Sequence, residues 1–366
     1  MRPPFGAYRL PPGAWRLALL FAGATMAGAV ADRLNVPLPW MLGALAFSML
    51  VSMAGFETSP PRAIRASGQV IVASSVGLAF TPATMAVLAT LILPMLLSAF
   101  ATILCGFLVA AVMMRLAHMD AVSASLASVP VGPVEMANLA EQYGIPPAPV
   151  VFAQTVRIVV TIMGIPPLLI WLDGSIADPN AALRDAVWTP GGALLLLSLG
   201  IAGAMLVKRT GVANPFFIGP IAFCAAATTL SFPVTALPYA VLAAGQVMLG
   251  TSLGAMFKQD FFLRARRFIP VALLSALLLI ALTGSIGLGL SHALGEPWPV
   301  MILATAPGSV TEMALTAKIL EQGVAVVTAF HLTRIFIILP MAPMFIRITA
   351  RLARKYGIGP PGKDPP

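Results

Sequence analysis

Two stretches of the sequence, VPVGPVEMANLAEQYG (Val129–Gly144) and APGSVTEMALTAKILEQG (Ala306–Gly323), repeat one pattern in a chain that is otherwise close to uniformly apolar. Each has proline and glycine followed by Glu-Met-Ala, and the two glutamates, Glu135 and Glu312, lie 177 residues apart. Proline and glycine break helices, so the pattern predicts a helix broken just before a carboxylate, present twice. The residues expected at the breaks are Pro130, Gly132, Pro133, Pro307 and Gly308.

The composition points to a membrane as the main solvent of the chain. Of its 366 residues, 59% are hydrophobic and 10% are charged, and the mean hydropathy is +0.93, whereas soluble domains carry about 25% charged residues. This predicts an all-α polytopic protein of the bacterial inner (plasma) membrane. The net charge of +9 comes from short basic clusters between apolar segments, which are interpreted as topology signals rather than as a nucleic-acid site.

The chain carries an internal duplication. Its clearest sign is a set of residues that recur at one offset of 177: Gln69 and Gln246, Pro130 and Pro307, Glu135 and Glu312, and Arg157 and Arg334. SGQVIVASSVGLAF (Ser67–Phe80) also resembles AGQVMLGTSLGAMF (Ala244–Phe257). The predicted organisation is a cytoplasmic N-terminal segment (1–14), a first repeat (15–172), an extracytoplasmic linker (173–189), a second repeat (190–350) and a cytoplasmic tail (351–366).

The basic clusters predict how the repeats are oriented. If the segments bearing Glu135 and Glu312 do not cross fully, each half crosses about five times, and almost all basic clusters fall on one side, opposite the acidic linker. The positive-inside rule then places both termini in the cytoplasm. An odd number of crossings inverts the second half, so we predict two inverted repeats of about five crossings plus a re-entrant or discontinuous helix each, a pattern common in secondary transporters. The clusters assigned to the cytoplasm are Arg2, Arg9 and Arg16; Arg62 and Arg65; Arg115; Lys208 and Arg209; Lys258, Arg264, Arg266 and Arg267; and Arg347, Arg351, Arg354 and Lys355.

Glu135 and Glu312 are the acidic residues that the pattern places inside the membrane, where an ionisable group costs about 3 kcal/mol on insertion scales. Two interpretations are open. In the structural one, each glutamate caps its own broken helix or pairs with Arg157 or Arg334. In the functional one, both glutamates bind a proton, a cation or a solute where the repeats meet. Each is expected in the first turn of the second half-helix, at the positive end of the helix dipole.

Arg157 and Arg334 follow their glutamates by 22 residues within apolar helices. They either form internal salt bridges or hold an anionic solute. In inverted-repeat transporters the broken helices of the two halves meet near the middle of the bilayer. We therefore expect the two breaks to approach one another beside the arginine helices. The residues expected to line a shared polar cavity there are Glu135, Glu312, Gln69 and Gln246.

Two further polar pairs lie within apolar segments. Gln69 and Gln246 either bond across helices or face the solute. Gln154 and His331 stand three residues before the two arginines. His331 either titrates or is simply hydrogen bonded. All four residues are candidates for solute or ion binding.

The repeated unit resembles the AbrB family of bacterial membrane proteins, over about residues 15–350. The resemblance lies in PWMLG, SGQV, VGPVEMANLAEQYG and FAQTVRI, in this order. The family hallmark is a Pro-Gly-Gly-x-x-Glu-Met stretch followed by a His/Gln-x-x-Arg helix, and this chain departs from it at Val131 and Ser309, where glycine is frequent. The matching residues are Pro130, Glu135, Met136, Gln154 and Arg157 in the first copy, and Pro307, Gly308, Glu312, Met313, His331 and Arg334 in the second.

The function predicted from the sequence is a secondary transporter of a small polar or anionic solute, coupled to protons or cations through Glu135 and Glu312. The alternative is a membrane-embedded regulator that acts indirectly on gene expression without moving a solute. Members of the resembled family have been described as regulators and as ammonia monooxygenases, but an oxygenase needs a His/carboxylate ligand set that the sequence pattern does not offer. No enzyme, cofactor or metal is expected. The expected partners are the lipid bilayer and a small-molecule solute, without direct nucleic acid, and a homodimer is left open.

Overall fold

The structure is a computed structural model that describes residues 13–56, 59–173, 180–212, 214–257 and 268–356. All regular elements within these ranges are helices. Some of the sequence predictions concern residues outside them, namely Arg2, Arg9, part of the linker (174–179), the basic cluster at 258–267 and the end of the tail (357–366).

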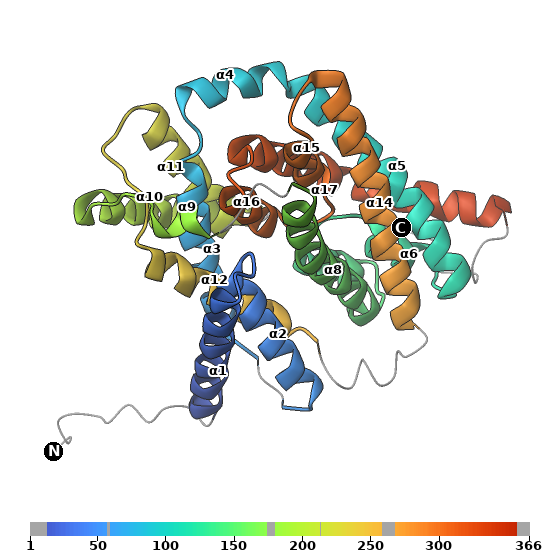
Figure 1. Ribbon diagram of the computed structural model, residues 1–366. Coiled ribbons are helices and arrows are strands. Elements are labelled where there is room, and N and C mark those ends of the chain that lie inside the picture. Colours follow the sequence, from blue (N-terminus) through green and yellow to red (C-terminus); the bar gives the residue numbers. More distant parts are fainter. Residues whose placement is uncertain (1–12, 57–58, 174–179, 213, 258–267, 357–366) are drawn as a thin grey trace.

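The helices follow a similar series in the two halves of the chain (Figure 1). Those of the first half and the linker are α1 (Ala14–Arg33), α2 (Pro39–Met53), α3 (Arg62–Gly77), α4 (Pro82–Thr90), α5 (Ile92–Leu116), α6 (Ala121–Ser128), α7 (Pro133–Gln142), α8 (Pro147–Asp173) and α9 (Ala181–Arg184). Those of the second half are α10 (Pro190–Lys208), α11 (Pro215–Thr229), α12 (Tyr239–Gly254), α14 (Phe268–Leu294), α15 (Trp298–Thr305), α16 (Val310–Ile319) and α17 (Val324–Tyr356).

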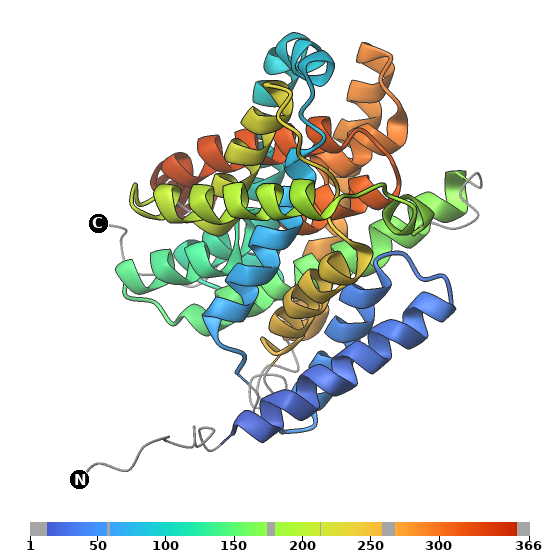
Figure 2. The same ribbon diagram turned by 90° about the vertical axis from the view of Figure 1, so that its left-hand side faces the viewer.

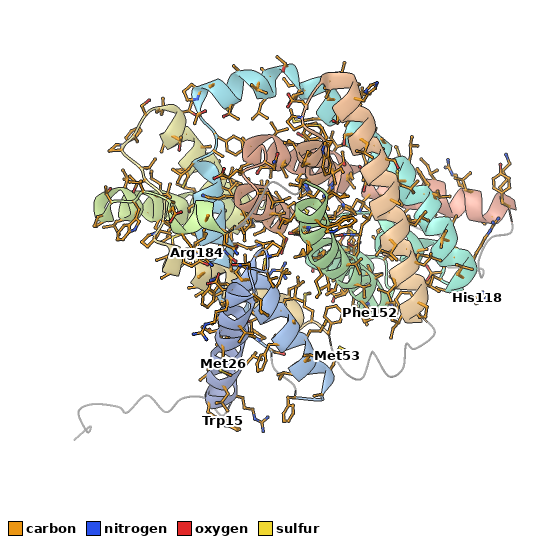
Figure 3. The ribbon with its side chains drawn as sticks, viewed as in Figure 1. Trp15, Met26, Met53, His118, Phe152 and Arg184 are labelled. Atoms are coloured by element: carbon orange, nitrogen blue, oxygen red, sulfur yellow. The ribbon has the colours of Figure 1, made fainter. Side chains whose placement is uncertain are left out.

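Within the described ranges, five helices are long and apolar enough to cross a membrane: α5, α8, α10, α14 and α17. The pair α3 and α4 would add a sixth span, although it is bent by 90°, and α2, α11 and α12 are apolar but shorter. Trp15 and Met26 on α1 (Figure 3) are more than half exposed, as on a surface that meets lipid. The chain is thus an all-α, multi-pass membrane protein, and the count of about five crossings per half stays a prediction.

The helix bounds recur with the offset seen in the sequence. α3, α6, α7 and α8 begin 177 residues before α12, α15, α16 and α17. The packing recurs as well: α2 packs against α12 while α11 packs against α3, and α5 packs against α17 while α14 packs against α8. Interchanging the two halves therefore leaves these helix pairs the same. Inversion of the halves across a membrane stays a prediction.

The helices form two bundles, each of which draws on both halves of the chain. In one bundle, α1, α2 and α3 pack with α10, α11 and α12, and Figure 2 shows α1 and α2 together at one edge of it. In the other, α5 to α8 pack with α14 to α17. The helix α3 packs against both α16 and α17, so it lies where the two bundles meet. This arrangement places Gln69 on α3 near the broken segment of the second half.

Close approach of helices in the first bundle depends on small residues. A Cβ added at Gly43 on α2 would collide with the carbonyl group of Ala27 on α1, and one added at Gly219 on α11 would collide with that of Gly203 on α10. The same contact is thus built in both halves. A side chain at either position would force a pair of helices apart.

Three features differ from the predicted organisation. The linker is not only a loop, since it contains α9, whose Arg184 forms a 2.7 Å ion pair with Asp32 at the end of α1 (Figure 3). The helix α17 continues to Tyr356, past the boundary expected at residue 350, because the alanine, arginine and leucine residues there favour helix. Arg62 and Arg65 belong to the first turns of α3 rather than to a connecting loop.

Candidate functional site

Each half of the chain contains one interrupted helix, as the sequence predicts. The breaks are residues 129–132, between α6 and α7, and residues 306–309, between α15 and α16. Glu135 and Glu312 lie in the first turn after their breaks. Pro133 is the first residue of α7 rather than part of the break, a position where its missing N–H has no partner to lose.

Arg157 and Arg334 hold the two breaks through backbone carbonyl groups. The acceptors of Nη1 and Nη2 are Val129 (3.3 Å) and Val131 (3.1 Å) for Arg157, and Ala306 (2.7 Å) and Gly308 (2.9 Å) for Arg334. The acceptors correspond at the offset of 177. Carbonyl groups freed by a break inside a membrane protein need such donors. The salt-bridge interpretation is wrong for this structure, because no ion pair joins either arginine to a glutamate among the described residues.

Gln154 and His331 support the same segments one turn earlier. Gln154 Nε2 donates to the carbonyl oxygen of Leu126 at 2.6 Å, and His331 Nε2 lies 2.9 Å from that of Leu303. His331 Nδ1 lies 2.8 Å from Nη2 of Arg334. Because a guanidinium can only donate, Nδ1 accepts and the proton of the neutral ring is on Nε2. Both ring nitrogens are therefore used, which favours the simply hydrogen-bonded histidine over the titrating one.

The two breaks meet in space. Arg157 Nε donates a 2.9 Å hydrogen bond to the carbonyl oxygen of Pro307, in the break of the other half. The corresponding pair would be Arg334 and Pro130. Arg334 is only 4% exposed, yet its Nε has no acceptor among the described residues. The two halves thus share their local hydrogen bonds but differ in this one contact between them.

A cavity of about 320 Å³ opens where the breaks meet. Residues 130–133 and 308–310 form part of its wall, and α3 contributes another part. The side chains that give it charge and polarity are Arg62, Arg65, Gln69, Glu135 and Arg334. Candidates from both repeats therefore border one space.

Glu312 and Gln246 depart from the prediction of a cavity lined equally by both copies. Neither borders this cavity. Glu312 is 2% exposed and Gln246 is fully buried, and Oε2 of Glu312 and both amide atoms of Gln246 lack a hydrogen-bond partner within the described ranges. The copies differ because α16 and α12 are enclosed where α7 and α3 face the cavity.

Comparison with known proteins identifies the family. Residues 40–350 match the family described as transition state regulatory protein AbrB. The chain belongs to this family. A protein of Escherichia coli (strain K12) named as a candidate regulator, AbrB, is 25% identical over 332 residues, which cover 88% of this chain and 92% of that protein. The uncharacterized protein YhjN of Bacillus subtilis (strain 168) is 24% identical over 365 residues, which cover 92% of this chain and 93% of that protein.

In this AbrB-family chain, the N-terminal ends of α7 and α16 both border the cavity. Neither N-cap residue, Gly132 or Ser309, has a side chain that accepts a hydrogen bond from its helix. At Gly132 a Cβ would collide with the carboxylate of Glu135, so glycine is what lets that carboxylate lie against the helix end. The cavity therefore faces the positive ends of two helix dipoles, one of which has its own carboxylate nearby.

Lys318 is a polar residue of the AbrB-family site that the sequence analysis missed. Its Nζ donates to the carbonyl oxygen of Ser75 at 2.7 Å and also contacts Ser75 Oγ. Lys318 and Glu321 border a second cavity, of about 410 Å³, near the C-terminal end of α3, whereas the first cavity lies near its N-terminal end. The signal in the sequence is a lysine in an apolar half-helix whose counterpart in the first half is Glu141.

Proposed function

We propose that this chain is a secondary transporter of the bacterial inner membrane that moves a small polar or anionic solute through the cavity between its broken helices. In this proposal the two halves are inverted repeats, both termini lie in the cytoplasm and the linker lies outside. Glu135 and Glu312 couple the movement of solute to protons or cations. Broken helices that meet between two halves are the usual setting of such sites.

The observation that carries the proposal is the unequal bonding of two equivalent arginines. Arg157 Nε is bonded to Pro307, whereas Arg334 Nε is buried beside a cavity without an acceptor among the described residues. In a transporter built from two equivalent halves, the states open to either side differ by an exchange of roles between the halves. The asymmetry supports one such state, with one arginine closing its contact across the breaks and the other released.

The positions of the two cavities fit this proposal. The first cavity includes Arg62 and Arg65 at the N-terminal end of α3, which the positive-inside rule assigns to the cytoplasm. The second lies at the opposite end of α3, where Lys318 bonds to Ser75. The proposed state is therefore open toward the cytoplasm, and the Lys318 contact belongs to the closed side.

The two glutamates are also unequal. Glu135 is half-buried and borders the cavity, whereas Glu312 is buried away from it. If the halves exchange roles, each glutamate in turn meets a water-accessible space. That alternation is what a carboxylate needs in order to load and release a proton or a cation during a transport cycle.

The test is flux through the purified protein in proteoliposomes. A screen of metabolites by thermal shift supplies candidate solutes, and uptake of the labelled solute is then driven by an imposed proton or sodium gradient. We expect accumulation that collapses when the gradient is dissipated and that empty liposomes do not show. The name of the Escherichia coli relative favours a regulator instead; binding of the solute without flux under any gradient would support that alternative.

A further inference from the structure

We propose that the cavity between the breaks is a carboxylate site, in which Arg334 Nε and the N-terminal ends of α7 and α16 donate hydrogen bonds to the carboxylate of a small organic anion. This rests on the proposed function, which places the solute in the cavity, and it specifies the chemistry of that solute. The solute would be an anion with a short apolar part rather than a neutral solute or a metal cation.

The charge around the cavity favours an anion. Arg62, Arg65 and Arg334 border it, and Glu135 is the acidic residue among its lining residues. The described wall therefore carries more positive than negative charge, and a cleft lined by one sign of charge concentrates ions of the other sign. A cation would have to compete with three guanidinium groups for one carboxylate.

Arg334 has a donor that the protein itself leaves unused. Its Nη1 and Nη2 donate to Ala306 and Gly308, but its buried Nε has no acceptor among the described residues. A buried charged donor without an acceptor is costly, and the equivalent Nε of Arg157 has one in Pro307. An oxygen atom of a bound anion would complete the set at Arg334.

The helix ends supply the remaining donors. α7 and α16 each have 10 residues, and both begin at the cavity wall. The first N–H groups of a helix have no partner within it, and here the N-cap side chains do not provide one. Backbone N–H groups combined with the positive end of a dipole are a recurrent anion-binding arrangement.

A carboxylate fits this set better than phosphate does. One carboxylate can accept from a guanidinium and from a backbone N–H with its two oxygen atoms. Glu135 would repel the second charge of a phosphate dianion at the same wall. Phe216 and Ile335 also border the cavity, and they offer an apolar surface for a short carbon chain, while Gln69 can bond to a hydroxyl or amino substituent.

The experiment measures thermal unfolding of the full-length protein in detergent. The probes are the sodium salts of acetate, succinate, citrate and glutamate, with sodium chloride and sodium phosphate at matched ionic strength. We expect at least one carboxylate to raise the Tm in a saturable way that chloride and phosphate do not reproduce. Absence of such a shift for every carboxylate would overturn the proposal.

Two variants at one position locate the site. Ser309→Asp places a carboxylate at the N-cap of α16, where it takes up the same N–H groups and repels an anion, and Ser309→Asn caps the helix without charge. Both residues are favoured N-caps, so both variants are expected to fold. Ser309→Asp should weaken the apparent affinity by roughly tenfold or more, whereas Ser309→Asn keeps most of it. Parental affinity in Ser309→Asp would overturn the proposed location.

Binding in detergent and flux in liposomes separate this proposal from the transporter. Saturable carboxylate binding without uptake contradicts transport and leaves the anion site standing. Gradient-driven uptake of a neutral solute by a protein that shows no carboxylate shift contradicts the anion site and leaves transport standing.

Discussion

The Nε of Arg157 donates a 2.9 Å hydrogen bond to the carbonyl oxygen of Pro307, so an arginine of the first half holds the broken helix of the second. The equivalent contact, between Arg334 and Pro130, is not made, and Arg334 Nε is left without an acceptor within the described ranges. One contact between two otherwise matching halves therefore distinguishes them at the site. The consequences of that difference can be measured.

Arg157→Lys is expected to shift the protein away from the state of this structure. Lysine keeps the charge but cannot reproduce the fork of an arginine, so the variant loses the bond to Pro307. Arg334→Lys removes no bond of Nε and should lack this shift. The measurement is labelling of Ser309→Cys, at the cavity wall, with a membrane-impermeant maleimide applied to each side. The ratio of outside to inside labelling should rise only in Arg157→Lys.

The labelling needs a background in which Cys105 and Cys224 are replaced by alanine. Thr210→Cys, at an exposed position, serves as a control whose labelling should not respond to either arginine variant. Equal ratios in the two lysine variants would show that the Arg157–Pro307 bond does not determine which side is open.

Glu135→Gln and Glu312→Gln are each expected to give folded protein whose gradient-driven uptake falls to background. The amide keeps the shape of the side chain and cannot release a proton or bind a cation in the same way. Uptake is measured across roughly pH 5–8, the range in which a proton-coupled group is usefully tested. Glu141→Gln, which changes an exposed carboxylate on the same helix as Glu135, is the matched control and should transport normally. Parental uptake by both site variants would make the carboxylates structural.

The inverted arrangement predicts that the linker and the end of α10 lie on opposite sides of the membrane. Asp185→Cys should be labelled from outside in intact cells, and Thr210→Cys only after the membrane is opened. Both positions are exposed. A linker that is labelled only from the cytoplasm would remove the inverted-repeat arrangement and, with it, the proposed exchange of roles.

His331→Gln is expected to keep most of the stability of the protein, because Gln154 performs the equivalent task in the first half. His331→Leu removes the donor to Leu303 and the acceptor for Arg334, and leaving such buried groups unpaired costs about 1–3 kcal/mol each. Thermal unfolding in detergent compares the two variants. If His331→Gln were the less stable variant, the proposed equivalence of the two supports would be wrong.

The sequence by itself determined the features that depend on neighbouring residues. The apolar composition indicated a multi-pass helical protein, because lipid demands long apolar helices. Proline and glycine clusters located both breaks and placed Glu135 and Glu312 in the first turn after them, because helix termination is a local property of the backbone. The constant offset of 177 also anticipated which helices correspond.

Only the tertiary structure decided how equivalent residues differ. Arg157 and Arg334 were open to carboxylates, carbonyl groups or an anion, and the carbonyl groups of the breaks proved to be their partners. Gln69 borders the cavity while its counterpart Gln246 is enclosed, although their local sequences are alike. The physical reason is that burial and hydrogen-bond partners depend on packing between residues far apart in the chain. Two copies of one local pattern can therefore have unequal surroundings once the halves pack together.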